Sequence, residues 1–135
     1  MAVSQREADC AMEGIRATRK FEREMKSGTA SLVLLSVLAK AQEPLYGYLI
    51  AKQIEADSEG TSLLKQGALY PVLRSLETGG LLVSQVEPST SGPPRRYYQI
   101  TELGRESLIE WTDIWARIRD FVEASLEGVS HDQER

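Results

Sequence analysis

The chain has 135 residues, of which 41% are hydrophobic and 27% are charged, and its formal net charge is −4. This size and balance predict one small globular domain with a modest core, and they exclude an intrinsically disordered chain. A single cysteine, Cys10, excludes an intramolecular disulfide and suits a reducing compartment, so we expect a cytoplasmic protein. We expect neither a membrane span nor a signal peptide, because apolar runs are short and charges interrupt the N-terminus.

The first third of the chain predicts two helices. Residues 5–26 are charged, free of proline and rich in helix formers, but their apolar stripe is thin. Such a helix is marginal alone, so we expect it to pack on another subunit or on the C-terminal helix. Ser27-Gly28 is interpreted as its end, since glycine commonly terminates helices. Residues 29–42 then predict a second helix, which breaks at Pro44.

Two more helices are expected before the chain turns to β-structure. From Leu45, apolar residues at helical spacing predict a third helix that ends near residues 58–60. Residues 66–78 predict a fourth helix that ends at Gly79-Gly80. Pro71 falls inside this fourth helix, so we expect an irregular first turn.

A basic β-hairpin is predicted next. Residues 81–86 and 96–101 are prone to form strands, and we expect residues 87–91 to join them. In the second strand, alternation predicts one face with Tyr97, Gln99 and Thr101 and an opposite face with Arg96, Tyr98 and Ile100. Pro93-Pro94 is expected to stiffen a hairpin tip that carries two guanidinium groups, those of Arg95 and Arg96.

The chain is expected to end in one long helix that starts at Glu102, with Thr101 as its N-cap. Apolar residues at alternating spacings of three and four form a seam suited to packing against another helix: Leu108, Trp111, Trp115, Ile118 and Val122. Ile114 and Phe121 widen this seam beyond the need of one small domain. The sequence therefore predicts a homodimer whose interface contains the seam.

Three helices, a hairpin and a terminal helix are the arrangement of a winged helix-turn-helix, a module that binds DNA. We therefore expect a mainly α fold with a small β-hairpin. Its predicted parts are an N-terminal extension helix in residues 1–28, a winged-helix DNA-binding domain in residues 29–101, and a C-terminal dimerisation helix with its tail in residues 102–135.

In this arrangement residues 66–78 are the recognition helix for the major groove, and residues 87–96 are the wing. The predicted DNA-binding side chains are polar or amphipathic residues of these two segments: Lys65, Gln66, Tyr70, Arg74, Arg95 and Arg96. Each has an alternative interpretation, because Tyr70 could be a packed aromatic residue and the arginines ordinary solvated charges. Residues 65–100 carry four basic and two acidic side chains, so the overall negative charge is weak evidence against DNA.

Several motifs resemble the PadR family of transcriptional regulators: Gly67-Ala68-Leu69-Tyr70-Pro71, Leu76-Glu77, Gly80-Leu81 and residues 92–98, followed by Thr101 and Gly104. The resemblance spans about residues 32–121. It implies a homodimeric winged-helix repressor of a palindromic operator, with the wing on the adjacent backbone or minor groove. The single C-terminal helix resembles the short branch of the family. The N-terminal helix precedes the usual start of the family, so the resemblance gives it no role.

The resemblance also implies a candidate effector site. In the multidrug-sensing branch of the family, a tryptophan of the C-terminal helix faces its mate across a pocket in the dimer interface. Trp115 occupies the matching register, fourteen residues after Thr101, and Trp111 lies one turn before it. A pair of indoles could stack on a small planar aromatic effector. The alternative is that both indoles only fill the dimer core.

Catalysis, cofactors and metals find little support in the sequence. His131 is the single histidine and lies in the tail, so a Ser-His-Asp triad in the core is excluded. One cysteine and one histidine are too few for a usual zinc site, and no phosphate-binding loop is present. A redox role of Cys10 would need a partner across the dimer.

The rival to a DNA-binding repressor is a winged helix that serves only as a protein-interaction module. The acidic C-terminal helix would then be the contact surface. The net charge favours this rival slightly, whereas the arginines and prolines of the wing favour DNA.

Overall fold

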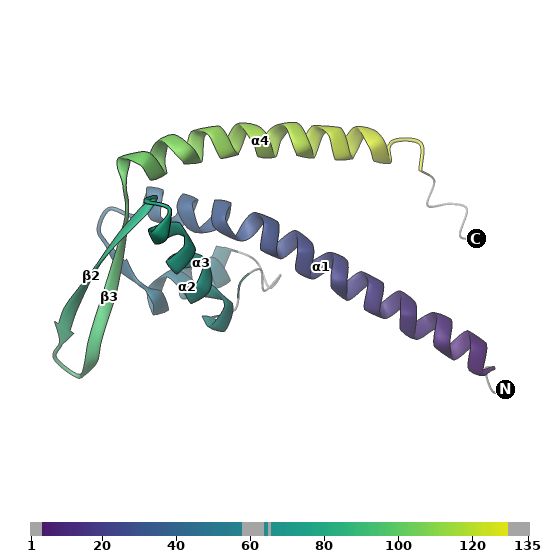
Figure 1. Ribbon diagram of the computed structural model, residues 1–135, viewed down its shortest axis with the longest axis horizontal. Helices are drawn as coiled ribbons and strands as arrows, with labels where there is room; N and C mark the ends of the chain where they lie inside the picture. The colour runs from purple at the N-terminus through teal and green to yellow at the C-terminus, as the bar shows by residue number, and fades with distance from the viewer. Residues whose placement is uncertain (1–3, 58–63, 65, 130–135) are drawn as a thin grey trace.

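The computed structural model describes residues 4–57, 64 and 66–129. In this part of the chain, helices alternate with a small antiparallel sheet (Figure 1). The elements follow the predicted order of a winged helix: α1 (Gln5–Lys40), β1 (Leu45–Tyr46), α2 (Gly47–Asp57), α3 (Gln66–Thr78), β2 (Leu82–Ser89), β3 (Gly92–Ile100) and α4 (Glu102–Leu126). The mainly helical class with a β-hairpin is confirmed.

The core lies where the C-terminal half of α1 meets α2, α3 and the inner face of the sheet. Its largest fully buried side chains are all aliphatic: Leu34, Leu35, Ile50, Ile54, Leu69 and Leu73. Each such side chain contributes about 1.5–3 kcal/mol by leaving water. Leu82, Tyr98 and Ile100 close this core from the sheet. The hairpin is therefore anchored at its base by the same core that holds α3.

The sheet has the strand order β1-β3-β2, and both pairings are antiparallel. Tyr98 and Ile100 are 5% and 6% exposed, whereas Gln99 between them is exposed. The predicted alternation of faces along the second strand is therefore confirmed at these residues.

The predicted end of the first helix at Ser27-Gly28 is wrong, because α1 runs without a break from Gln5 to Lys40. Gly28 does not adopt the positive φ with which a glycine usually ends a helix; Gly80 and Gly128 are the glycines that do so in the described residues. The Thr29 hydroxyl donates to the Met25 carbonyl at 2.8 Å, within the helix. The glycine is thus an interior residue of one long helix.

The prediction that a helix starts at Leu45 is also wrong. Leu45 and Tyr46 form the short strand β1, which pairs with Tyr98 and Tyr97 of β3, and α2 begins at Gly47. The helical spacing of apolar residues continues through Leu45 and Tyr46, but their pairing with β3 makes these two residues a strand. The predicted end near residues 58–60 lies outside the described residues.

The hairpin tip differs from the prediction as well. The strands extend to Ser89 and from Gly92, so Thr90 and Ser91 form the turn. The prolines and arginines expected at the tip instead lie within β3. Pro93 and Pro94 are tolerated because β1 pairs only with Tyr97 and Tyr98, and the β2–β3 register shifts between Glu87 and Ser89.

Thr101 joins the hairpin, the end of α3 and the start of α4. As predicted, it is the N-cap of α4, and its hydroxyl accepts from the Gly104 backbone N–H at 3.0 Å. The same hydroxyl donates to the Gly80 carbonyl at 2.7 Å, and the Thr101 N–H donates to the Leu81 carbonyl at 3.0 Å. Gly80, at φ 83°, ends α3 as predicted.

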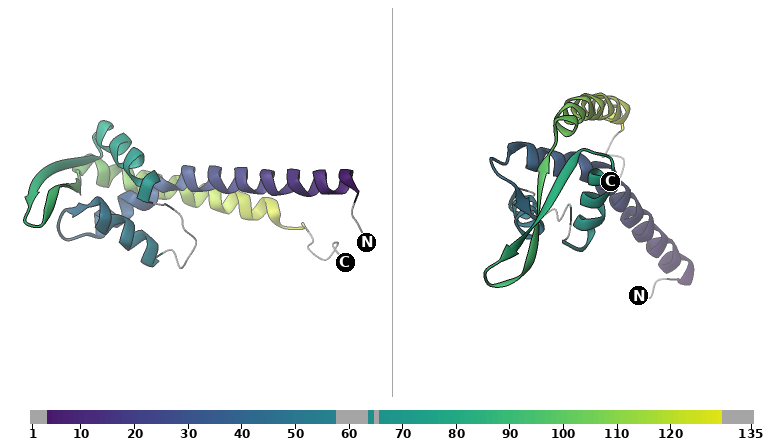
Figure 2. Two further views of the ribbon diagram at one scale, coloured as in Figure 1. Left: turned by 90° about the horizontal axis from the view of Figure 1, so that it is seen from below. Right: turned by 60° about the vertical axis from the view of Figure 1, so that its left-hand side comes forward.

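α1 and α4 leave the winged-helix part in the same general direction and then diverge (Figures 1 and 2). They lie together along the C-terminal part of α1, where Gly28 and Leu32 share a groove with α4 and Arg105 donates to the Ala39 carbonyl at 3.5 Å. Their far ends lie toward the two termini. Within the part of the chain that the structure describes, no helix combines the length and the apolar character that crossing a membrane requires.

Candidate nucleic-acid interface

α3 has one buried stripe and one exposed face. Leu69, Leu73 and Leu76 are at most 5% exposed and fix the helix on the core. The other side exposes Gly67, Ala68, Pro71, Arg74 and Ser75. Small residues near the start of this face allow a ligand to approach the backbone, and Arg74 adds a positive charge. The geometry suits insertion of the first turns into a groove.

Tyr70 lies at the edge of this face, against the start of α2. A Cβ atom placed on Gly47 would stand 2.5 Å from the Tyr70 hydroxyl oxygen, so the phenol occupies the space that a side chain would need. The Tyr70 side chain remains 40% exposed. It therefore packs between the two helices and also presents surface beside the exposed face of α3.

Arg95 folds back onto an aromatic cluster. Its guanidinium carbon lies 4.4 Å from the centroid of the Tyr46 ring, which meets the Tyr97 ring edge-on at a centroid distance of 5.4 Å. The Tyr46 ring also stacks on Tyr48 at 6.3 Å. This cation–π contact connects the hairpin to β1, directly before α2.

Arg96 is connected to α3 through a serine. Its Nη1 donates to the Ser84 hydroxyl at 2.9 Å, and that hydroxyl donates to a Glu77 carboxylate oxygen at 2.6 Å. Burial raises the pKa of the neighbouring Tyr98 phenol above its ordinary value of 10.0; the Arg96 guanidinium opposes this shift and the Glu77 carboxylate adds to it. The hairpin is thereby connected to α3 as well.

Lys52 of α2 adds a basic side chain beside the aromatic cluster of Tyr46 and Tyr48. Its ammonium nitrogen lies 5.7 Å from the centroid of the exposed Tyr48 ring. Lys52, Tyr46 and Tyr48 were not among the residues predicted from the sequence. The available signal was the pair of tyrosines soon after Pro44, of which Tyr46 ends β1 and Tyr48 lies in the first turn of α2. Of the other predicted residues, Lys65 and the Gln66 side chain lie outside the described residues.

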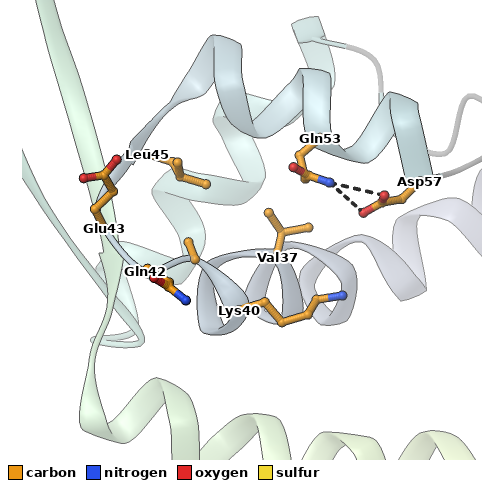
Figure 3. Close-up of a pocket in the computed structure, with 8 residues that line it drawn as sticks. Val37, Lys40, Gln42, Glu43, Leu45, Gln53 and Asp57 are labelled. Atoms are coloured by element: carbon orange, nitrogen blue, oxygen red, sulfur yellow. Dashed lines mark hydrogen bonds between the residues drawn. The ribbon is translucent and has the colours of Figure 1, made fainter.

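Concave surfaces also lie away from this face. A groove of about 330 Å³ between α1 and α4 contains both tryptophans and is lined by Gly28, Thr29, Ser31, Leu32, Trp111, Ile114, Trp115 and Ile118. A cleft of about 750 Å³ separates the end of α1 from α2, where Gln53 donates to both carboxylate oxygens of Asp57 at 3.2 Å (Figure 3). Among the described residues, no cluster of three or more acidic, histidine or cysteine side chains is placed to hold a metal ion.

A sequence profile of the transcriptional regulator PadR-like family matches residues 34–110, which contain α2, α3 and the complete hairpin. The chain belongs to the PadR-like family of transcriptional regulators. The structure is similar to that of a PadR family transcriptional regulator from Eggerthella lenta, with a TM-score of 0.67, 33% sequence identity and coverage of 88% of this chain and 98% of that chain.

Other similarities agree with this membership. A PadR-like transcriptional regulator from Bacillus cereus has a TM-score of 0.62 and 28% identity, and the match covers 78% of this chain and 98% of that chain. A protein of Lysinibacillus sphaericus, named only as uncharacterized, is 29% identical over 99 residues, or 73% of this chain and 88% of that protein. In this PadR-like regulator, most of α1, residues 5–33, precedes the matched segment.

Proposed function

We propose that this PadR-like regulator is a homodimeric, non-enzymatic repressor that binds a palindromic operator. The observation that supports it best is that one core holds the exposed face of α3 and the arginine-bearing hairpin in a fixed relation. α3 enters the major groove, where Gln66, Tyr70 and Arg74 meet base edges and Lys65 meets the backbone. Arg95 and Arg96 contact phosphates beside it.

Sequencing of DNA fragments captured by the purified protein tests this function. We expect an inverted repeat whose half-sites are about one helical turn, roughly 34–36 Å, apart, since two-fold symmetry places two recognition helices in successive major grooves. Fragments that share no motif, together with no measurable binding to any duplex at low salt, would instead support the protein-interaction module.

The dimer interface that we propose contains the seam of α4. Leu108 and Trp111 already pack on the core of their own chain, whereas Ile118 and Val122 are 52% and 46% exposed. Trp115 is intermediate in exposure and lies in the groove between α1 and α4. A second copy of the chain would cover the side chains of the α4 seam that stay exposed in a single chain.

The groove supports a second, more specific proposal: a planar aromatic effector stacks on Trp115 and Trp111. Fluorescence titration with a panel of planar aromatic compounds tests it. Saturable quenching that disappears in Trp115→Ala, while the dimer persists, supports an effector site. If no compound quenches, the indoles serve to pack the dimer.

A further inference from the structure

A serine of β2 links the hairpin to the last turn of α3. The Ser84 hydroxyl accepts from Nη1 of Arg96 at 2.9 Å and donates to a Glu77 carboxylate oxygen at 2.6 Å. Together the three residues form the Ser84 bridge. In the described part of the chain, Glu77 and Arg96 form no direct ion pair, so a single hydroxyl group joins the two charges.

The Ser84 bridge lies on the face of the hairpin that closes the core. Leu82 pairs with Ile100 and Ser84 pairs with Tyr98 across the two strands. Paired residues of antiparallel strands share a face, and every second residue of a strand returns to that face. Arg96 stands two residues before the buried Tyr98, so it follows in the same row. The bridge therefore begins where the apolar packing of the hairpin base ends.

The hydrogen bonds of the bridge are of a strong kind. A hydrogen bond with an ionised donor or acceptor is shorter and stronger than one between neutral groups. Ser84 and Glu77 are half-buried, so solvent screens their contact less than it screens a contact on the open surface. Burial raises the pKa of the adjacent Tyr98, whereas the guanidinium groups of Arg96 and Arg74 oppose this shift. Arg74, on the exposed face of α3, thus acts on the same phenol as the bridge.

The outer part of the hairpin needs such a contact to keep a fixed direction. Because β1 has two residues, residues 92–96 of β3 pair with β2 alone, and the ribbon extends away from the helices (Figure 1). A ribbon of two strands is marginally stable in isolation. Arg95 contacts Tyr46 on one face of the ribbon, and Arg96 contacts Ser84 on the other, since successive side chains alternate. The two arginines thereby hold the ribbon from both faces.

We propose that Glu77 and Ser84 are positioning residues for DNA recognition. The Ser84 bridge holds the hairpin at one distance and angle from α3, so that both elements meet the same half-site together. A contact that is in place before binding reduces the entropy that binding removes. The inference rests on the proposed function, and it adds two residues that act through Arg96 and make no DNA contact themselves.

Ser84→Ala tests the bridge, because it removes the hydroxyl and leaves every charge in place. The probes are the duplex recovered by fragment capture and a shuffled duplex of the same length and composition. We expect the dissociation constant for the captured duplex to rise about threefold to tenfold, the equivalent of one typical hydrogen bond. The shuffled duplex is held by phosphate attraction without a fixed register, so its affinity should change little. The ratio of the two affinities therefore falls, whereas partial unfolding would weaken both equally.

Further variants separate positioning from a general loss of structure. Ser84→Thr keeps the hydroxyl on a residue that strands favour, and it should restore the ratio. Ser36→Ala removes another half-buried serine hydroxyl, whose bond to the Val33 carbonyl stays within α1, and should leave the ratio unchanged. Glu77→Ala should lower the ratio as Ser84→Ala does. In an Arg96→Ala background, Ser84→Ala should have no further effect, because the bridge is already broken.

Backbone amide order parameters of residues 85–91, measured by NMR, report the hairpin without DNA. A lower ratio in Ser84→Ala, accompanied by lower order parameters and reversed in Ser84→Thr, supports the positioning role. An unchanged ratio in Ser84→Ala overturns that role and leaves the DNA-binding repressor standing. Absence of wild-type binding to any duplex at low salt overturns both.

Discussion

Arg95 uses only one face of its guanidinium in the contact with Tyr46. A stacked guanidinium keeps its N–H groups in its own plane, where they remain free to meet a phosphate. Arg96 likewise donates a hydrogen bond from Nη1 to the Ser84 hydroxyl, and its guanidinium has further N–H donors. Internal partners therefore hold both side chains in place without exhausting their capacity to bind DNA, and holding them lowers the entropy that binding must remove.

Removal of these arginines should weaken DNA binding irrespective of sequence. We expect Arg95→Ala and Arg96→Ala each to flatten the dependence of log K on log salt by about 0.9 for every phosphate that is no longer neutralised. Fluorescence anisotropy titrations from about 50 to 200 mM salt measure the slope. Arg117→Ala, which removes an exposed charge from α4, is the control and should leave the slope unchanged. An unchanged slope and affinity in the double variant would rule out the hairpin as a DNA element.

Tyr98 predicts a loss of stability in alkali. Its pKa is raised in the folded protein, so above about pH 10 the unfolded chain releases the phenol proton while the folded chain keeps it. The unfolded state then binds fewer protons, and the free energy of unfolding falls as the pH rises. Tyr98→Phe removes this contribution. Urea unfolding at about pH 8 and about pH 10.5 should show a smaller alkaline decrease for the variant than for the wild type, and an equal decrease would contradict the prediction.

Residue-scale prediction from sequence succeeded where the signal is local. Thr101 is followed three residues later by the N–H that its hydroxyl caps, so neighbouring residues suffice to predict its role. Neighbouring residues do not suffice to predict the contacts of Arg95 and Arg96. Tyr46 lies far upstream, and Glu77 reaches Arg96 only through Ser84, so both arginines were expected free at a tip.

At the scale of elements, periodicity predicted α3, α4 and the base of the hairpin well, whereas both long strands extend further toward the tip than expected. The buried stripe of α3 repeats at the helical period, and no other conformation buries it as a unit. The break expected in α1 was wrong because a glycine costs only about 1 kcal/mol within a helix, and the packing of the following leucines outweighs it. β1 was missed because two residues form a strand only through pairing with β3.

We expect the first turn of α4, directly after the hairpin, to tolerate no side chain at Gly104. A Cβ atom there would collide with the Leu81 carbonyl oxygen and with Ile100. We expect Gly104→Ala to lower the free energy of unfolding by about 1–3 kcal/mol, as overpacking typically does. Urea denaturation measures this change. Gly28→Ala, where the helix is open, should instead raise stability by up to about 1 kcal/mol, and equal effects of the two variants would contradict the collision.

At the scale of the whole molecule, the exposed apolar faces of α4 and α1 predict that the protein is not stable as a monomer at working concentrations. Ile109, Phe121 and Leu126 are 60–73% exposed in the single chain. Static light scattering at micromolar concentration should give twice the chain mass of 15.0 kDa. Acrylamide should quench the tryptophans poorly in that dimer. A monomer mass with both indoles freely quenched would contradict the proposed interface.

The hydrogen bonds at Thr101 also bear on how α4 can move relative to α3. α4 has 25 residues, so it is a lever about 37 Å long, and its short end is fixed to the last turn of α3 through Gly80 and Leu81. A tilt of the far end of α4 cannot be absorbed at a flexible hinge, because the backbone at Gly104 is already in close contact with Leu81. Such a tilt of α4 would instead rotate the base of the hairpin and the end of α3. A contact on the outer turns of α4 therefore bears on the orientation of α3.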